Sequence, residues 1–446
     1  MKKVLIIAND FPPIGGAGVQ RAFYFSKFLP EFDWQPFVMT VKDVAFPVKD
    51  HTLVPALPDS VRIVRTESLE LRRLLWLLQA LRHKVGAGDE DVTYGHRASH
   101  DVGAGTREVG RSLKRWLFVP DDRMLWIPFV VPKAVRIIRE EDIPLIHATA
   151  PPYSSAVIGR IISRVTKRPL VIDLRDPWTK DPYAPNPTGF HRYFNEYSER
   201  RALADASRVI VISPAMRRSL LQAYPDMEPR KVEIITNGFD AREFASIEPA
   251  KRSRRFVLAY VGSLYAHHRE VLSAVCNAWS SLADRNPDFA NNGRLLLVGR
   301  CDPEIHAELR AWRSVDVEVL GYQPHERAIG HLKGASALLL LIRDLDPEVH
   351  TITIPGKLFE YLGSGRRILM VGPQGDAAEM VARHAGFVHR QVDVRAIRGS
   401  LEQLFRSSTQ GSDAPVYEPT TEYDRRSLTG RLAQVFTEVT RARRQP

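Results

Sequence analysis

The chain has 446 residues, 44% hydrophobic and 26% charged, which is ordinary for a globular protein with more than one core. Its two cysteines are too few for a disulfide framework or a zinc site and fit a reducing, cytoplasmic compartment. No apolar run approaches the roughly 18 residues of a membrane-spanning helix. The net charge of +11 favours an anionic partner. Because the sequence has no zinc-finger or RNA-binding signature, we expect no nucleic acid partner.

Short apolar runs alternate with helical stretches in the N-terminal half. The first run, 4–9, follows two lysines, and it resembles a buried strand more than a signal segment because it is short and has no small-residue cleavage site. The other runs lie at 36–41, 144–149, 169–174, 208–213 and 232–236. This alternation predicts a doubly wound parallel sheet.

A second series of apolar runs follows a polar stretch near 240–255. The runs lie at 256–262, 294–299, 317–321, 337–342 and 367–372. Several end in glycine, at the sheet edge where ligands bind in open α/β folds. We therefore expect two Rossmann-like domains facing each other across a cleft, at 1–245 and 254–418.

Residues 83–112 are rich in glycine and polar residues and predict a mobile loop. The flanking stretches 69–84 and 113–130 combine arginine and lysine with leucine and with Trp116 and Trp126. Such a mixture suits an anionic membrane surface. The alternative is a helix packed on its own sheet.

Residues 354–369 carry the most informative pattern. A helix is predicted to begin at Pro355 and Gly356, which places Lys357 and Glu360 on one face. The helix N-terminus and the lysine suit a diphosphate, and the glutamate can accept hydrogen bonds from two ribose hydroxyls. The alternative is a surface ion pair at the start of an ordinary helix.

Three further loops follow predicted strands. Gly15, Gly16 and Gly18 let the backbone approach a ligand, although the loop lacks the dinucleotide fingerprint and a plain turn is the alternative. Gly262 and Ser263 end a strand, and Arg269 begins a helix where it can bind phosphate or be solvated. Tyr322 and Gln323 can clamp a base, or they belong to an ordinary loop.

Polar side chains also follow two strands of the first half. Asp173, Arg175 and Asp176 follow one strand, where they can recognise sugar hydroxyls or form a buried ion pair. His147 lies near the end of another strand, where a lone histidine is commonly structural. Adjacent His267 and His268 are poorly spaced for one metal ion, so we expect no metal site.

These segments resemble the family 4 type of GT-B glycosyltransferases over nearly the whole chain. The motifs that carry the resemblance are FPPIGGAGVQR, DLRDPW, ISPAMRRSL, IITNGFD, YVGSLY, LLLVG, VLGYQP and IPGKLFEYLGSGRRIL. The resemblance implies that a final helix in 419–446 crosses back to the N-domain. The family often has two glutamates eight positions apart. Glu360 matches the second, but Ile352 stands at the first position.

The resemblance implies a hexosyltransferase-like enzyme. It would move a sugar, with retention, from a UDP- or GDP-linked donor to a sugar or lipid-linked acceptor. No obligatory cofactor or metal is implied. The catalytic residues would be Arg269, Lys357 and Glu360, and a bacterial envelope or exopolysaccharide pathway on the inner membrane face is the commonest setting. The missing glutamate leaves two alternatives: a non-catalytic nucleotide-sugar-binding protein and a nucleotide-sugar epimerase of the same architecture.

Overall fold

The computed structural model describes residues 1–42, 49–69, 116, 118–179, 186–251, 255–343, 354–409 and 417–443. The predicted loop at 83–112, nearly all of the predicted helix at 69–84, and Ile352 lie outside these residues. The chain forms two compact units. The first holds 1–212, 217–235 and 429–446, and the second holds 213–216 and 236–428. The chain therefore passes between units near 235, and its last segment belongs to the first unit.

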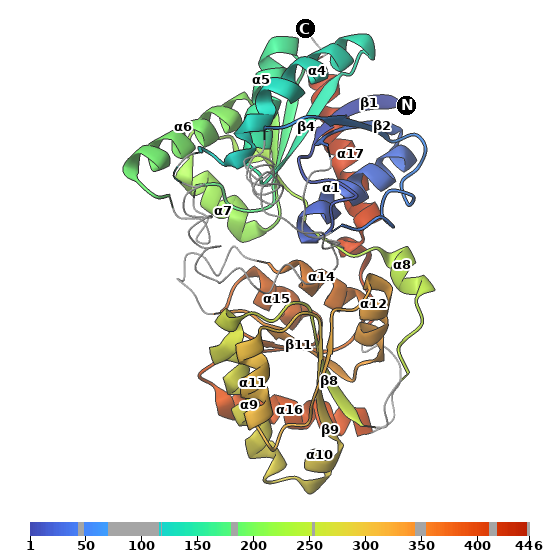
Figure 1. Cartoon of the computed structure of the whole chain (residues 1–446), viewed down its shortest axis with the longest axis vertical. Helices are drawn as coiled ribbons and strands as arrows, with labels where there is room; N and C mark the ends of the chain where they lie inside the picture. Colours follow the sequence, from blue (N-terminus) through green and yellow to red (C-terminus); the bar gives the residue numbers. More distant parts are fainter. Residues whose placement is uncertain are drawn as a thin grey trace, which may run out of the picture. The chain divides into compact units, whose positions relative to one another are not determined.

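The first unit contains a seven-stranded parallel sheet with the order β3-β2-β1-β4-β5-β6-β7 (Figure 1). Its strands are β1 (Lys2–Ile7), β2 (Trp34–Val41), β3 (Arg62–Thr66), β4 (Leu145–Ala150), β5 (Leu170–Leu174), β6 (Arg208–Val211) and β7 (Val232–Ile234). The six predicted strands of this half are confirmed. The sequence pattern missed β3, because this edge strand is only partly buried and its sequence, RIVRT, carries two arginines.

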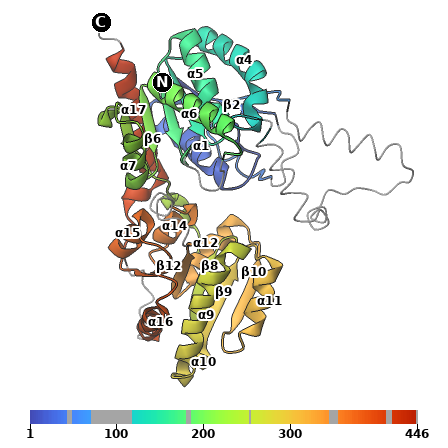
Figure 2. The same ribbon diagram turned by 90° about the vertical axis from the view of Figure 1, so that its left-hand side faces the viewer.

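Helices cover both faces of this sheet. They are α1 (Ala17–Phe28), α4 (Ile127–Glu140), α5 (Ser154–Thr166), α6 (Gly189–Asp205), α7 (Pro214–Ala223) and α17 (Arg425–Ala442), with short 3-10 turns η1 (Leu29–Phe32), η2 (Asp122–Trp126) and η3 (Pro229–Lys231). Figure 2 shows α17 running beside α7 and β6. On one face, the ring of His147 meets Phe25 of α1 and Phe436 of α17. On the other, Gly159 of α5 packs so closely that a Cβ there would lie 2.9 Å from that of Ala148.

A membrane-facing stretch at 113–130 would have Trp126 on the surface, but the structure places this residue in the core. It is fully buried, and its Nε1 donates a hydrogen bond of 2.6 Å to Thr66 Oγ1. Trp116 of the same stretch is exposed. Trp126 therefore belongs to the core, as the alternative interpretation of this stretch required.

The second unit contains a six-stranded parallel sheet with the order β10-β9-β8-β11-β12-β13. Its strands are β8 (Phe256–Val261), β9 (Gly293–Val298), β10 (Val317–Gly321), β11 (Ala337–Leu341), β12 (Ile368–Val371) and β13 (Phe387–His389). Its helices are α8 (Ala241–Ser246), α9 (Arg269–Ala283), α10 (Pro287–Asn292), α11 (Pro303–Ala311), α12 (His325–Gly334), α14 (Gly356–Gly363), α15 (Asp376–Arg383) and α16 (Val394–Thr409), with η4 (Ala266–His268) and η5 (Thr421–Tyr423). The sequence pattern missed only β13 in this sheet, a half-buried edge strand of three residues.

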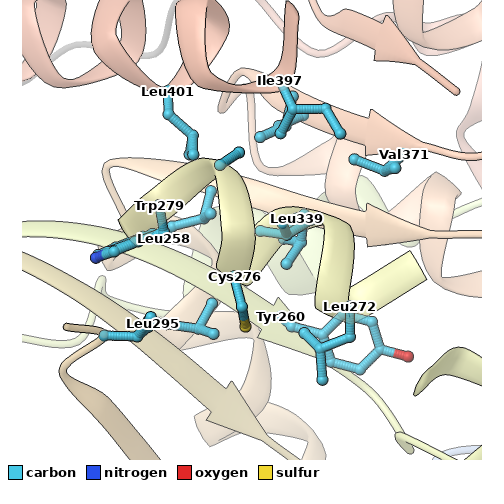
Figure 3. Packing of buried hydrophobic residues seen from close by; sticks show 14 of the residues in the cluster. Leu258, Tyr260, Leu272, Cys276, Trp279, Leu295, Leu339, Val371, Ile397 and Leu401 are labelled. Carbon is cyan, nitrogen blue, oxygen red and sulfur yellow. The ribbon is translucent and has the colours of Figure 1, made fainter. Parts of the chain in front are cut away.

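Both faces of the second sheet carry a hydrophobic core. Figure 3 shows one of them, in which Cys276 and Trp279 of α9 lie among side chains of the strands and of α16. Burial raises the pKa of the Cys276 thiol to about 12, so it is an unreactive core group. Both cysteines are free thiols. Within the described part of the chain, no helix has the length and apolar character needed to cross a membrane.

Candidate functional site

Three glycines lie at the C-terminal ends of three neighbouring strands of the second sheet. Gly262 follows β8, Gly299 follows β9 and Gly321 ends β10, and all three have positive φ angles, of 141°, 135° and 68°. A Cβ at Gly299 would lie 2.2 Å from the carbonyl oxygen of Gly262. Only glycine lets these strand ends approach each other and expose their backbone at the edge where ligands bind.

The same edge receives the side chain of Lys357, from the first turn of α14. A Cβ at Gly262 would lie 2.9 Å from Lys357 Nζ, so the glycine makes room for the ammonium group. Pro355 is the N-cap of α14 and Gly356 is its first residue, as predicted. The structure therefore brings together the glycine after β8, a lysine and the N-terminus of a helix, although the two segments are far apart in the sequence.

Tyr361 fixes α14 against β8. Its hydroxyl accepts a hydrogen bond of 2.8 Å from the Val261 N–H and donates one of 3.1 Å to the Val261 carbonyl. Leu358 and Leu362 on the same face are buried in the core. Because one residue anchors both the helix and the strand end, Lys357 is held at the strand edge by rigid elements.

Tyr260 is a site residue that the sequence did not single out. Lys357 Nζ donates a hydrogen bond of 2.5 Å to Tyr260 Oη and lies 4.3 Å from the ring centroid. The same hydroxyl donates a hydrogen bond of 2.9 Å to the carbonyl of Ser263. Tyr260 lies within an apolar run, where an aromatic residue predicts only core packing, so no local pattern would have found it.

The environment of Lys357 lowers the pKa of its ammonium group. Burial lowers the pKa of Lys357 from its usual 10.5 to about 8, against a smaller opposite effect of Glu360. The group is therefore a partly desolvated cation near neutral pH. Such a cation interacts more strongly with phosphate than a lysine surrounded by water.

The affinity for a nucleoside diphosphate is expected to fall as the pH rises above about 8, because Lys357 then loses its charge. The fall can approach tenfold per pH unit where binding needs the protonated amine. Calorimetric titration of wild type and Lys357→Ala, from about pH 7 to about pH 9.5, measures it. The variant should bind weakly with no such slope, and an equal slope in both proteins would remove Lys357 as its source.

Glu360 lies one turn after Lys357 and is half-buried. Its negative charge also acts on His325, at the start of α12. Desolvation alone would lower the pKa of His325, but the hydrogen bond that it donates to the Glu243 carboxylate and the charges of Glu360 and Glu243 raise it. His325 was not predicted as a site residue, and its Nε2 lies 3.3 Å from Glu243 Oε1.

Three more residues predicted for the donor side lie in the second unit: Tyr322 and Gln323 follow β10, and Arg269 begins α9. Tyr322 is exposed, and Gln323 Nε2 donates a hydrogen bond of 3.0 Å to the Leu320 carbonyl. Arg269 begins α9, where its Nε lies 2.7 Å from Glu308 Oε2 of α11 in a largely exposed ion pair. Its guanidinium is therefore engaged by a carboxylate in this structure.

Arg343 is a further cation near Lys357, and it was not predicted as a site residue. It follows β11, and its charge, after the larger effect of burial, helps to lower the pKa of His267 in η4. Lys357 acts on both His267 and His268, and burial is the main reason that the pKa of His268 falls to about 4. Two cations thus lie close to η4, and a positive residue after a buried strand was the only local signal for Arg343.

In the first unit, Asp173 forms the buried ion pair that was one of its two alternatives. Arg21 of α1 donates three hydrogen bonds of 2.8 to 3.1 Å to the Asp173 carboxylate and one of 2.8 Å to the Ile235 carbonyl. Arg21 and Asp173 have side chains only 4% and 0% exposed. His147 is also buried, and burial lowers its pKa to about 4, so the imidazole is neutral.

Arg175 connects the predicted glycine loop to the end of β5. Its guanidinium donates hydrogen bonds to the carbonyls of Gly18 and Pro151. A Cβ at Gly18 would lie 3.6 Å from Arg175 Nη1 and 4.0 Å from Asp10 Oδ2. Asp10, which follows β1, was not predicted as a site residue. The predicted Asp176 is exposed and follows Arg175 directly in the sequence.

Gly15 and Gly16 lie in the loop that leads into α1. Gly16 is the N-cap of this helix, its φ angle is 104°, and a Cβ there would meet nothing within 4 Å. The neighbouring Asn9 is buried, and its amide group finds no hydrogen-bond partner among the described residues. No group of histidine, cysteine or carboxylate side chains suited to a metal ion occurs in the described part of the chain.

Known proteins resemble this chain in part of its sequence and in all of its fold. Residues 71–243 match Glycosyltransferase Family 4. The alpha-maltose-1-phosphate synthase of Mycobacterium tuberculosis is 33% identical over 86 residues, 19% of this chain and 20% of that protein. The chain therefore aligns with only about a fifth of the length of this curated relative.

Two solved structures match nearly the whole chain. The Anabaena protein HepE in complex with UDP has a TM-score of 0.60 and 17% identity, covering 98% of this chain and 100% of that one. Sucrose-phosphate synthase from Thermosynechococcus elongatus has a TM-score of 0.58 and 13% identity, covering 99% and 100%. The chain therefore shares the GT-B fold of these structures, and its residues 71–243 match Glycosyltransferase Family 4.

Proposed function

We propose that this protein is a glycosyltransferase that moves a sugar from a UDP- or GDP-linked donor to an acceptor hydroxyl. The observation that carries the proposal is the position of Lys357. Its ammonium group lies beside Gly262, and the residue itself is in the first turn of α14. A helix N-terminus and a desolvated lysine together suit a diphosphate. The family 4 match and the fold shared with a UDP-bound protein support the same donor class.

Negative charge grows on the β-phosphate as the glycosidic bond breaks. In the proposed reaction Lys357 and the N–H groups at the start of α14 stabilise this charge. Arg343 adds positive charge near η4, and Arg269 would join once released from Glu308. Because Lys357 is held at the start of a helix, it needs little rearrangement as the charge develops.

We further propose retention of anomeric configuration, by attack on the face from which the diphosphate departs. The departing phosphate then helps to take the proton of the acceptor hydroxyl. The anomeric proton coupling of the product, measured by NMR before it equilibrates, tests this step. An inverted product would contradict it.

The acceptor side is proposed to lie on the first unit, at the ends of β1 and β5. Asp176 is exposed there and can accept a hydrogen bond from a sugar hydroxyl. Asp173 and His147 are buried, so in this proposal they support the loop rather than contact the acceptor. A sugar or lipid-linked acceptor of a bacterial envelope or exopolysaccharide, used at the inner membrane face, suits the net charge of +11.

A panel of nucleoside diphosphates and nucleotide sugars, screened by thermal shift, is the first test. Selective stabilisation by uridine or guanosine forms would support the donor site and name the base. The stabilising donor is then incubated with and without sugar and lipid-linked acceptors. Acceptor-dependent release of the nucleoside diphosphate supports transfer. Donor binding without turnover supports the non-catalytic alternative, and donor conversion without an acceptor supports the epimerase.

Glu360→Ala is expected to weaken binding of the nucleoside diphosphate by about 10- to 100-fold. The reason is that the ribose hydroxyls lose their hydrogen bonds to a charged acceptor, the Glu360 carboxylate. Calorimetry with the ribose and 2′-deoxyribose forms of the same nucleotide measures it. If Glu360 holds the ribose, the variant should discriminate less between the two forms. Glu379→Ala on the exposed face of α15 is the matched control. Unchanged affinity for the ribose form in Glu360→Ala would exclude the ribose role.

A further inference from the structure

Helix α6 has one buried face and an opposite face of exposed aromatic side chains. Its inner face packs on the first unit and buries His191, Glu199, Ala202 and Leu203. Its outer face carries Phe190, Tyr193, Phe194 and Tyr197, which are 64%, 63%, 40% and 46% exposed. We call these four residues the α6 aromatic face. Their spacing of three, four and seven positions places them on one side of the helix. Figure 1 shows α6 as the outermost helix on its side of this unit.

The four rings form a continuous surface. Phe190 and Phe194 have ring centroids 4.5 Å apart, Tyr193 and Phe194 5.6 Å, and Tyr193 and Tyr197 6.5 Å. Trp116, which is 56% exposed, lies close to this helix, because the Nε2 of the buried His191 lies 3.0 Å from the Trp116 carbonyl. A contiguous patch of exposed large apolar side chains often marks a binding surface for a protein or a membrane. The α6 aromatic face is therefore suited to contact something outside this unit.

The size of this face argues against a second copy of the chain as its partner. Four aromatic side chains about half exposed present roughly 400 Å² in total. A stable dimer buries about 800 Å² on each partner, so this face alone is too small to hold one. Partial insertion into a lipid interface has no such minimum, because each aromatic side chain contributes separately.

The charges around the rings favour an anionic surface. The exposed charged residues of α6 are Arg192, Arg200, Arg201 and Glu196, a net charge of 3 − 1 = +2. Arg201 lies over the Tyr197 ring, 5.4 Å from its centroid, so cation and aromatic share one side of the helix. Long arginine side chains beside tyrosine rings can reach lipid phosphates while the rings enter the interface.

We propose that the α6 aromatic face docks on an anionic lipid bilayer. Phenylalanine rings would enter the boundary between headgroups and acyl chains, tyrosine hydroxyls would stay at headgroup level, and the arginines would contact lipid phosphates. This surface is distinct from residues 69–84, and it does not depend on the transfer chemistry proposed above. The sequence pattern alone does not reveal this surface, because aromatic residues at helical spacing are also typical of a core helix.

Co-sedimentation of the full chain with vesicles tests the proposal. The vesicles contain either phosphatidylcholine alone or equal parts phosphatidylcholine and phosphatidylglycerol, at low and high salt. Phe190→Ser/Tyr193→Ser is expected to lower binding to the anionic vesicles about tenfold or more, because two interfacial side chains are lost. Arg200→Gln/Arg201→Gln should reduce binding to the anionic vesicles and weaken its salt dependence. Val165→Ser/Val392→Ser, which also removes two exposed apolar side chains, is the matched control and should bind as wild type does.

Thermal unfolding and light scattering accompany each variant. All four mutated α6 positions are exposed, so wild-type melting temperatures are expected. Equal anionic-vesicle binding by wild type and Phe190→Ser/Tyr193→Ser would overturn the proposal, as would absence of wild-type binding at low salt. A wild-type dimer that this substitution dissociates would show that a second copy, and not a membrane, covers the face. Donor nucleotide affinity should be unchanged in every variant.

Discussion

Replacing Lys357 with alanine is expected to lower sugar-transfer turnover about 10²- to 10³-fold, the usual loss when one preorganised group that stabilises transition-state charge is removed. Lys357 Nζ lies between Tyr260 Oη and the backbone of Gly262, so no neighbouring cation can replace it without moving. Turnover at saturating donor, from the rate of nucleoside diphosphate release, measures the effect. The melting temperature should change little, because the pKa of about 8 shows that burying this charge is itself unfavourable.

Lys251→Ala removes an exposed lysine of the same unit and is the matched control. Its turnover should equal that of wild type. Tyr260→Phe tests how Lys357 is positioned, because it removes the hydroxyl and keeps the ring, and it should produce a smaller loss. If Lys357→Ala keeps near-normal turnover in a folded sample, the diphosphate does not bind at α14. The same measurement on Arg343→Ala and Arg269→Ala would then identify the cation that it uses.

The second large effect is expected on stability, in Arg21→Met. This substitution keeps most of the side-chain volume but leaves the Asp173 carboxylate buried without its cation. Breaking a buried ion pair on one side costs about 3–5 kcal/mol. Urea unfolding of the full chain, followed by a probe in the first unit, measures the loss. Arg21→Met/Asp173→Leu removes both charges and should recover much of the stability.

The pH dependence of this loss has a defined sign. Burial alone would raise the pKa of Asp173, but the charge and hydrogen bonds of Arg21 lower it below its usual value. The pair therefore stabilises the folded chain above the unfolded pKa of about 3.9, and this contribution is lost as the pH falls. Without Arg21, burial raises the pKa of Asp173, so the carboxyl group becomes protonated in mild acid and destabilises the variant less. The difference in the free energy of unfolding between wild type and Arg21→Met should therefore narrow as the pH falls from about 7 to about 4.

Arg164→Met is the control for this experiment. It removes one of two arginines from Asp205 in a largely exposed ion pair of the same unit. Exposed pairs contribute about 0–1 kcal/mol, so the expected loss is small at every pH. A loss for Arg21→Met no larger than that for Arg164→Met would mean that solvent reaches Asp173 and that the pair is not a buried one.

The sequence alone predicted the parallel strands that are buried on both faces, because a continuous apolar run is a local signal. It missed β3 and β13, edge strands whose burial is partial and whose apolar signal is correspondingly weak. It also predicted the start of α14, since Pro355 and Gly356 act through local backbone geometry. Lys357 and Glu360 follow from that start by helical spacing alone.

Contacts between distant segments were decided only by the tertiary structure. Lys357 meets Tyr260 across 97 positions, and Arg21 meets Asp173 across 152. No local pattern distinguishes Tyr260 from its apolar neighbours, or an Asp173 that faces α1 from one that faces solvent. The parallel strand order sets both contacts. It aligns the C-terminal ends of β1, β4 and β5 in the first sheet, and those of β8, β11 and β12 in the second.

Helix α6 shows the same limit. Its sequence determines a helix with aromatic residues on one side and a mixture of polar and apolar residues on the other. Helical periodicity is identical whichever side is buried. The structure buries Ala202 and Leu203 and leaves the α6 aromatic face outside, because the surface that receives the helix is built from other segments of the chain. Local chemistry thus determines the elements and the residues they carry, while packing between distant segments determines which of those residues meet and which face outward.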